Sequence, residues 1–529
     1  MTQMNTDYQD SKIKNYAGIF KKPIVYLLIA LGVWTSFSSL KYCFRLQYDS
    51  WIVLLWLFMV IYSVIYLIFQ VYFPWYLYCR FKKTRSIEAT QSEFSVDVLF
   101  PAYDEPTWIV ERALKAAKKV TFPHKTYLLD DNPDGRYEQL AKELKGEYLT
   151  RNDNLDRKAG NINGALKKTS GDLIAIFDID HAPQPDFLDL TLSYFKDPQI
   201  GFVQVMQTFC NAKDGLIAEA SVQTSLEYFN ITAVCKDNVN AMSHHGSNAV
   251  IRRKALKSIG GYQPGLAEDL ETSLDLHAKG WKSKYVCEPL APGLAPADFR
   301  AFCKQQLKWS KGVFEAALRS FLDGTFLKLT WHQRLAYTIR YSYYLVGLST
   351  LLGMMLTLYY LMQPSADVYE GFMARFLPFT VVAMGIRCYI MRMWGTDPMA
   401  KKGLLYKGTS LVFSIWPVYL VSLITTVIRI KIPFMSTPKE KNHDVEIWTV
   451  APQMVMISAL GLGVLWKILH WYKSPAPLTV ILAFILIGQH WILVVPIRQL
   501  FKKWIKGIKR ESVKTDLKAT STTQDDLKN

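Results

Sequence analysis

The order of apolar and polar positions divides the chain into three parts. Two apolar runs near the start, Pro23–Leu40 and Trp51–Phe73, are each long enough to cross a hydrocarbon core of about 30 Å. From about residue 95 to 320 the apolar runs are short and alternate with amphipathic stretches, and long apolar runs return after residue 330. The pattern predicts a water-soluble domain between two membrane segments.

The middle part has the periodicity of an α/β domain. Its predicted strands are Val96–Phe100, Tyr127–Leu129, Leu173–Phe177 and Gly201–Val205, and its clearest helices are Ile109–Lys119 and Tyr137–Leu144. Strands that alternate with helices build a mixed, mostly parallel sheet, whose ligands gather at the carboxyl ends of the strands. We therefore predict an α/β fold with the site at that edge.

The second membrane segment contains one ambiguous run. Four of its runs are plausible spans: Tyr341–Met362, Phe376–Met393, Val450–Leu469 and Leu478–Val495. Basic residues gather at 401–407, 429–441 and 502–510, and all of these segments are cytoplasmic only if the fifth run, Leu411–Ile428, does not cross the bilayer. We predict six spans and an interfacial helix at 409–428, with a seventh span as the alternative.

These patterns give a predicted domain organisation. Its parts are a flexible segment 1–20, a transmembrane hairpin 21–85, a cytosolic domain 90–325, a transmembrane domain 326–500 with a loop at 430–445, and a basic, disordered tail 501–529. The predicted protein is integral to a bacterial-type inner or plasma membrane, and its middle domain is cytoplasmic.

Composition agrees with a membrane protein. Of the 529 residues, 50% are hydrophobic and 14% aromatic, and the formal net charge is +17. The basic residues lie beside the apolar runs rather than in one stripe, which argues against nucleic acid as a partner. The seven cysteines show no CxxC pairing, as is typical of free thiols in a reducing compartment.

The first chemical signal is a carboxylate pair at a strand end. Asp178 and Asp180 follow the apolar run Leu173–Phe177, and alternation along a strand puts both side chains on the same side. Carboxylate oxygens suit Mg²⁺ or Mn²⁺, usually with phosphate as a further ligand. Two nearby aspartates are also common in turns, so this motif indicates a metal site only if the surrounding residues support one.

Further polar groups stand where a nucleotide-sugar site needs them. Tyr103 and Glu105 follow the first strand, and Asp130 and Asp131 follow the second, where carboxylates could hold uracil and ribose. Lys158 precedes a glycine in Arg157–Asn163, a combination that binds diphosphate. Taken singly, each group is also typical of a turn or a helix start.

Two later segments could serve the acceptor. Glu268 and Asp269 open a predicted helix, where acidic residues either cap the helix or supply a general base. Gln305, Lys308 and Trp309 lie on the amphipathic stretch Phe299–Leu318 just before the membrane. The Trp could be an interface anchor or a stacking platform for a sugar ring.

Together and in this order, the motifs resemble those of the membrane-integrated, processive β-glycosyltransferases of glycosyltransferase family 2, which include cellulose, hyaluronan and chitin synthases. The family signature is Asp-Asp, Lys-Ala-Gly-Asn, DxD, TED and QxxRW. The similar positions are Asp130-Asp131, Lys158–Asn161, Asp178/Asp180, Ala267-Glu268-Asp269 and Gln305/Lys308/Trp309. The segment Phe434–Lys439 is similar to the family's gating loop, FxVTxK.

The resemblance implies a cytosolic domain of GT-A type and a role for each matched residue. Asp269 is the implied base, and Asp178 with Asp180 the implied ligands of Mg²⁺ or Mn²⁺. The implied nucleotide-sugar contacts are Tyr103, Glu105, Asp130, Asp131, Lys158, Asp178, Gln305, Lys308, Phe434, Thr437 and Lys439. The implied acceptor contacts are Trp309, His244, His245, Gly246 and Glu268.

The chain departs from the family pattern at three places. Lys308 replaces an Arg and so loses its bidentate fork. Ala267 replaces the Thr of TED, and His244-His245 replace an aromatic–Cys pair beside the acceptor. The chain ends soon after its last predicted span, so we expect no C-terminal cyclic-di-GMP-binding domain; any such control would come from accessory or regulatory export subunits.

The implied activity is processive, inverting transfer from a UDP-sugar, with export of the growing polysaccharide across the bilayer. The stretch 266–281 and the arrangement of interfacial helix and gating loop most resemble those of cellulose synthases, which implies UDP-glucose as the donor and a cellulose-like β-glucan as the product. A hyaluronan- or chitin-type synthase that uses UDP-N-acetylglucosamine and a non-processive lipid-phosphate glycosyltransferase are enzyme alternatives. A transporter with a nucleotide-sensing domain is the alternative from another class, although Arg387 is the lone charge well inside a later predicted span.

Overall fold

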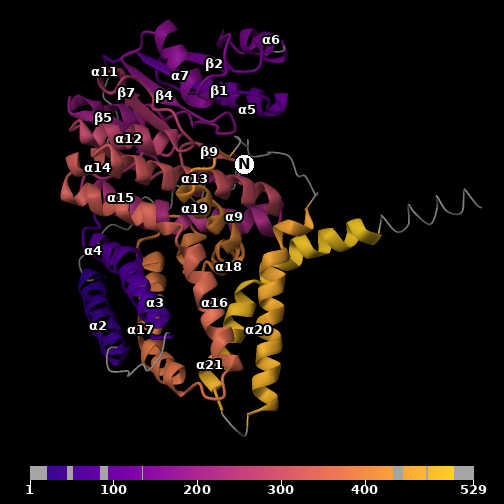
Figure 1. Cartoon of the computed structure of the whole chain (residues 1–529). Coiled ribbons are helices and arrows are strands. Elements are labelled where there is room, and N and C mark those ends of the chain that lie inside the picture. Colours follow the sequence, from indigo (N-terminus) through magenta and orange to yellow (C-terminus); the bar gives the residue numbers. More distant parts are fainter. Residues whose placement is uncertain are drawn as a thin grey trace, which may run out of the picture.

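The computed structural model describes residues 21–43, 52–83, 93–133, 135–432, 445–471 and 475–505. In Figure 1 an α/β domain lies at the top, long helices extend below it, and shorter helices lie between the two parts. Three predicted gating-loop residues, Phe434, Thr437 and Lys439, lie outside the described residues.

The α/β domain is built on a seven-stranded sheet with the order β3-β2-β1-β4-β7-β5-β8. Its strands are β1 Val96–Ala102, β2 Lys125–Asp130, β3 Glu147–Thr150, β4 Leu173–Ile176, β5 Ile200–Val205, β7 Ala249–Arg252 and β8 Lys282–Val286. Only β7 runs antiparallel to its neighbours in this sheet. The short strands β6 (Thr208–Phe209) and β9 (Pro292–Gly293) pair separately. The predicted mixed, mostly parallel sheet is confirmed.

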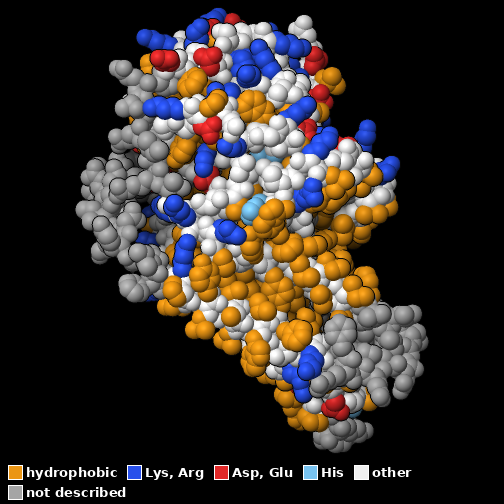
Figure 2. Space-filling view, turned by 90° about the vertical axis from the view of Figure 1, so that its left-hand side faces the viewer, with side chains coloured by type: hydrophobic (Ala, Val, Ile, Leu, Met, Phe, Trp, Pro, Cys, Tyr) orange, Lys and Arg blue, Asp and Glu red, His pale blue; other side chains and the backbone are white. Residues whose placement is uncertain are grey.

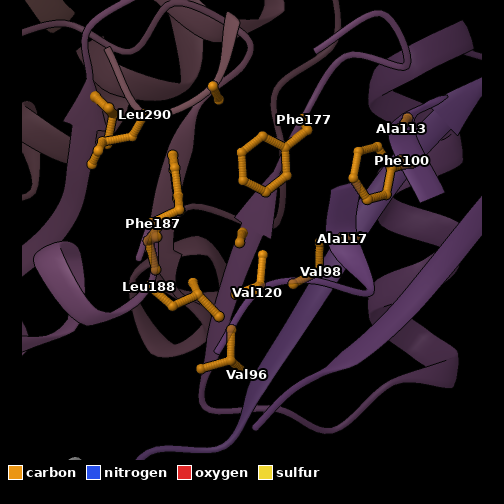
Figure 3. Packing of buried hydrophobic residues seen from close by; sticks show 14 of the residues in the cluster. Val96, Val98, Phe100, Ala113, Ala117, Val120, Phe177, Phe187, Leu188 and Leu290 are labelled. Atoms are coloured by element: carbon orange, nitrogen blue, oxygen red, sulfur yellow. The ribbon is translucent and has the colours of Figure 1, made fainter. Parts of the chain in front are cut away.

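Helices cover both faces of the sheet because its central strands are apolar on both sides. The helices between residues 107 and 328 are α5 Thr107–Ala117, α6 Arg136–Glu143, α7 Arg157–Lys168, α8 Asp189–Leu192, α9 Leu216–Glu227, α10 Ala233–Asp237, α11 Arg253–Ser258, α12 Glu268–Ala278, α13 Phe299–Leu322 and α14 Thr325–Lys328. On one face Val98 and Phe100 of β1 pack with Ala113 of α5 (Figure 3). On the other, Leu99 packs with Ile162 of α7. This alternation is the pattern of a strand buried on both faces.

The rest of the described chain is mainly helical, and several of these helices are long and apolar. The helices are α2 Lys21–Cys43, α3 Ile52–Leu67, α4 Phe73–Tyr78, α15 Trp331–Tyr343, α16 Val346–Met362, α17 Asp367–Trp394, α18 Tyr406–Ser414, α19 Trp416–Val427, α20 Ala451–Leu469 and α21 Pro477–Gln489. A π-helical turn, Ile68–Tyr72, joins α3 to α4.

Among the described residues, five helices are long and apolar enough to cross a membrane, or up to seven spans if each of two bent pairs counts as one. The bends are 50° between α15 and α16 and 47° between α18 and α19. The predicted six spans fall within this range. The run predicted as one interfacial helix at 409–428 is two helices joined at Ile415, and its interfacial placement stays a prediction.

The outer surface of the long helices is apolar. Figure 2 shows hydrophobic side chains gathered over the lower part of one face, whereas charged side chains gather on the α/β domain. Exposed large side chains of the long helices include Leu27, Trp34, Phe37, Val381, Val455, Leu462 and Phe484. An exposed apolar surface of this extent fits a lipid environment.

A buried ion pair joins the ends of the central strands that face away from the site. Arg253 Nη2 lies 2.7 Å from Asp97 Oδ2, with both side chains at most 10% exposed. The same carboxylate accepts a hydrogen bond from the Gly171 amide at 2.6 Å, and Arg253 donates to the Leu166 carbonyl at 2.9 Å. One cation thus ties β1, the end of α7 and the turn before β4 to the start of α11.

We expect Arg253→Ala to lower the free energy of unfolding by about 3–5 kcal/mol, because it leaves Asp97 buried without its counter-charge. Thermal unfolding of the purified protein in nanodiscs measures the loss. Lys142→Ala is the control: it removes an exposed ion pair with Glu138 and should change stability by less than about 0.5 kcal/mol. Equal effects of the two variants would contradict the assignment.

Candidate active site

The carboxyl ends of β1, β2 and β4 bring the candidate groups to one edge of the sheet. These strands are parallel neighbours, and Ala102 of β1 is in register with Asp130 of β2. Tyr103 and Glu105 follow β1 directly, and the Tyr103 amide donates to Glu105 Oε2 at 2.8 Å. Asp178 follows β4, and its amide donates to Ser247 Oγ at 2.9 Å.

Lys158 is the cation at the centre of this edge. It projects from the first turn of α7, and its Nζ lies 2.5 Å from Asp178 Oδ1 and 3.7 Å from Glu268 Oε1. Nζ also donates to the Gly246 carbonyl oxygen at 2.8 Å. One ammonium group therefore joins β4, the loop before β7 and the start of α12.

The electrostatics of the site follow from this arrangement. Burial alone would lower the pKa of Lys158, but Asp178 and Glu268 outweigh burial and raise it. Burial alone would raise the pKa of Asp178, but Lys158 outweighs burial and lowers it. At neutral pH the pair is therefore ionised, and Lys158 is a fixed positive charge.

Asp269 lies beside Lys158 with the properties of a general base. Burial, and next the neighbouring Glu268, raise the pKa of Asp269 to about 6. A carboxylate with this pKa is ionised at neutral pH and accepts a proton more readily than an ordinary aspartate. Gly246 takes φ +79°, and a Cβ there would lie 3.3 Å from both Asp269 Oδ2 and Lys158 Nζ. A glycine at this position keeps the space beside Asp269 and Lys158 clear.

Asp178, Asp180 and His181 can together hold a divalent metal ion. One ligand atom from each lies within 4.8 Å of the others. His181 Nδ1 lies 2.9 Å from the Ala291 carbonyl oxygen, so a protonated Nδ1 leaves Nε2 as the ligand atom. Asp180 Oδ2 accepts from the Leu294 amide at 3.1 Å. His181 has no role in the sequence prediction, although it directly follows the DxD motif.

The two carboxylates after β2 are held by protein partners. Asp130 Oδ2 accepts from the Tyr148 hydroxyl at 2.8 Å, and Oδ1 accepts from the Asn132 amide at 3.0 Å. Asp131 binds the guanidinium of Arg151 through both of its oxygens. Arg151 is a second residue that the sequence prediction lacks, because only the folded chain brings it to Asp131.

The adjacent histidines have different surroundings. His244 is 1% exposed, and its ring nitrogens each lie 2.9 Å from a partner, Gln204 Oε1 and the Tyr262 hydroxyl. Burial lowers the pKa of His244 to about 3, so it is neutral. His245 is less buried and shares a 2.8 Å hydrogen bond with the Tyr228 hydroxyl. Of the two, His245 is the better placed to meet an acceptor.

Gln305, Lys308 and Trp309 lie on α13, within two turns of Gly312, at positions that share one side of a helix. A Cβ at Gly312 would lie 2.7 Å from the backbone nitrogen of Ala267, in the segment 267–269 that holds the candidate base Asp269 and leads into α12. On the membrane side, Ser310 Oγ lies 2.5 Å from Ser422 Oγ of α19. Helix α13 thus contacts both the base segment and the membrane part.

Comparison with known proteins identifies the domain. Residues 95–312 match the family described as Glycosyltransferase like family 2. This stretch is a family 2 glycosyltransferase domain. It contains every predicted site residue except those of the gating loop.

Curated relatives support the cellulose synthase branch of the family, as the motifs predicted. The cellulose synthase catalytic subunit [UDP-forming] of Xanthomonas axonopodis is 35% identical over 46% of this chain and 34% of that protein. That of Pseudomonas fluorescens is 31% identical over 63% of this chain and 47% of that protein. The chain thus spans between a third and a half of the length of these relatives.

Among solved structures, a Pyrobaculum calidifontis mannosyltransferase in complex with GDP-Man and Mn²⁺ matches 70% of this chain and 99% of its own. The TM-score is 0.48 and the sequence identity is 16%.

We expect Gly312→Ala to reduce sugar transfer by the glycosyltransferase domain about 100-fold, because α13 must move away from the base segment. Initial rates with a labelled UDP-sugar measure the effect. Gly353→Ala is the matched control, since a Cβ at that helical glycine meets no atom within 4 Å. Unchanged transfer by Gly312→Ala would show that the close approach is not required.

Proposed function

We propose that the protein is a processive, inverting β-glycosyltransferase that polymerises glucose from UDP-glucose into a cellulose-like β-glucan and passes the chain across the membrane. The observation that carries the proposal is the position of Asp269, a carboxylate with a raised pKa, beside the cation Lys158 at the carboxyl edge of the sheet. Such a site provides a base for the acceptor and a positive charge for the leaving diphosphate.

In the proposed reaction Asp269 takes the proton of an acceptor hydroxyl. The acceptor oxygen then attacks the anomeric carbon from the face opposite the diphosphate, and the bond from that carbon to the diphosphate oxygen breaks. An α-linked donor thus gives a β-linkage. Lys158 stabilises the negative charge that develops on the departing UDP.

Asp178, Asp180 and His181 would hold a divalent ion, Mg²⁺ or Mn²⁺, which supplies further positive charge against the diphosphate. Because Asp178 also contacts Lys158, both positive charges would meet the same leaving group.

The proposed acceptor path leads from Asp269 towards the membrane. His245 and Trp309 stand at its start in this proposal, and Gln305 and Lys308 contact the nucleotide from α13. Exposed apolar helices support a membrane protein. The proposal puts the glycosyltransferase domain in the cytoplasm, where UDP-sugars are available, and the basic loops beside the apolar helices support this orientation.

We expect purified protein in nanodiscs with Mg²⁺ or Mn²⁺ to convert UDP-glucose alone into a long glucan, which a β-1,4-specific glucanase degrades. Chelation with EDTA should stop synthesis, and added Mn²⁺ or Mg²⁺ should restore it. Polymer formed only with UDP-N-acetylglucosamine would favour the hyaluronan- or chitin-type alternative. Label found only in lipid would favour the lipid-phosphate transferase.

We expect Asp269→Asn to reduce transfer at least about 100-fold while UDP binding persists, because an amide accepts no proton. In the wild type, the rate should rise with pH through about 6 and then level, since Asp269 is an active base only when ionised. Asp186→Asn, at an exposed position, is the control. Full activity of Asp269→Asn, or a rate that falls between pH 5 and 7, would contradict the assignment.

A further inference from the structure

The guanidinium of Arg151 is held entirely by protein partners. Nε and Nη2 bind the two carboxylate oxygens of Asp131, the second at 2.8 Å. Nη1 donates to Leu155 O at 2.6 Å and to Asp153 Oδ1 at 3.2 Å, and Nη2 also donates to Arg157 O at 2.9 Å. These five hydrogen bonds use all five N–H donors of the guanidinium group. No donor is left for a phosphate, so Arg151 is not a direct ligand of the substrate in this arrangement.

The partners of Arg151 lie on both sides of the nucleotide site. Asp131 follows β2, the strand of the predicted nucleoside site. The carbonyls of Leu155 and Arg157 lie where the chain enters α7. Lys158, the next residue of this helix, contacts Asp178. Arg151 therefore connects the end of β2 to the start of α7 through its hydrogen bonds.

The turn that Arg151 holds is not a relaxed one. Asp156 and Arg157 both take left-handed backbone conformations, with φ of 55° and 48°. Such conformations are unfavourable for residues other than glycine, so the turn needs support from other contacts. The Asp131–Arg151 pair can give it, because the two side chains are only 7% and 12% exposed and bind through both carboxylate oxygens.

Helix α7 also lies very close to the turn that precedes it. A Cβ on Gly160 would collide with the Leu155 carbonyl oxygen, the same oxygen that Arg151 binds. Gly164, one turn further along α7, has space: a Cβ there would lie 4.0 Å from Arg151 Cδ. Gly160 and Gly164 thus form a matched pair for substitution: an added Cβ collides with the turn at the first position and has space at the second.

We propose that Arg151 is a positioning residue that sets Lys158 relative to the nucleoside site, and that Asp131 acts by holding Arg151 rather than by touching the nucleotide. The inference rests on the proposed function, because it assumes that Lys158 and the end of β2 bind the two halves of a UDP-sugar. It separates the roles of the two adjacent aspartates, since Asp130 has other partners, Tyr148 and Asn132.

The test is UDP binding by isothermal titration, with full-length protein in nanodiscs. Arg151→Lys keeps the charge but loses the fork, and we expect it to weaken UDP binding about tenfold or more. Asp131→Asn should give a similar loss, and the double variant should bind no more weakly than the weaker single variant. Asp153→Asn is the control, because its carboxylate is 69% exposed and an asparagine keeps an oxygen that can accept from both Arg151 and the Leu155 amide.

A double-mutant cycle separates positioning from general destabilisation. If Arg151 acts through Lys158, Arg151→Lys should cost much less in a Lys158→Ala background than in the wild type. Equal, additive losses in both backgrounds would overturn the proposal, as would unchanged UDP binding by Arg151→Lys. The pH midpoint of transfer near 6 should stay in place, because Asp269 is not a partner of Arg151.

Gly160→Ala provides a second route if Arg151→Lys does not fold. It should weaken UDP binding as Arg151→Lys does, whereas Gly164→Ala should leave it unchanged. Equal binding by the two glycine variants would overturn the proposal. A wild-type protein that binds no UDP would overturn the proposed function as well, whereas UDP binding that is the same in all variants would overturn this inference alone.

Discussion

The attraction between one ammonium group and the acidic groups around it is the interaction on which the site depends. Asp178 comes from the end of β4, and Glu268 and Asp269 come from the start of α12. Without a cation these carboxylates would repel one another in a partly buried space. Lys158 contacts Asp178 and Glu268 directly and also binds the Gly246 carbonyl. It therefore stabilises the arrangement of three segments that are distant in the sequence.

Lys158 can do this only because the rest of the fold brings it to the right place. Helix α7 packs on β1 and β2 through Ile162 and Ala159, which fixes the axis of the helix. The turn before it is fixed from the other side by Arg151 and Asp131. On the side that faces the long helices, the close approach of Gly312 to Ala267 sets the distance between α13 and the start of α12. Apolar packing thus sets the positions of the elements, and a few polar contacts set the positions of the charges.

Much of this fold could be predicted from the sequence, because periodicity is a strong signal in long apolar elements. The predicted strands at 96–100, 127–129, 173–177 and 201–205 correspond to β1, β2, β4 and β5. The short strands β3, β7 and β8 were not predicted. In β7, for example, four residues end in an arginine and give no clear alternation. The antiparallel direction of β7 is a property of the whole sheet, so no local pattern could show it.

For the site too, sequence patterns predicted some features, whereas others depend on how distant segments pack. Motif order predicted Lys158, Asp178 and Asp269, and the structure brings these three together. Arg151 could not be predicted in its role, because its partners Asp131, Leu155 and Arg157 are recognisable only once β2 and α7 are placed. For His244, type and position suggested an acceptor contact, but burial and two hydrogen bonds occupy its ring. Sequence reveals which groups are present, and packing decides which of them are accessible.

One apolar core runs without interruption from the base helix into the membrane part. Leu270 and Leu274 of α12 pack in a cluster that includes Phe302 of α13, Leu411 of α18 and Tyr419 of α19. Because the same cluster also includes Leu493, a ribosome has to deliver about 220 further residues after Asp269 before this core can close. During synthesis helix α12 therefore completes its packing only after most of the later helices have been made. Completion of the α/β domain is thereby tied in time to the synthesis of the helical part.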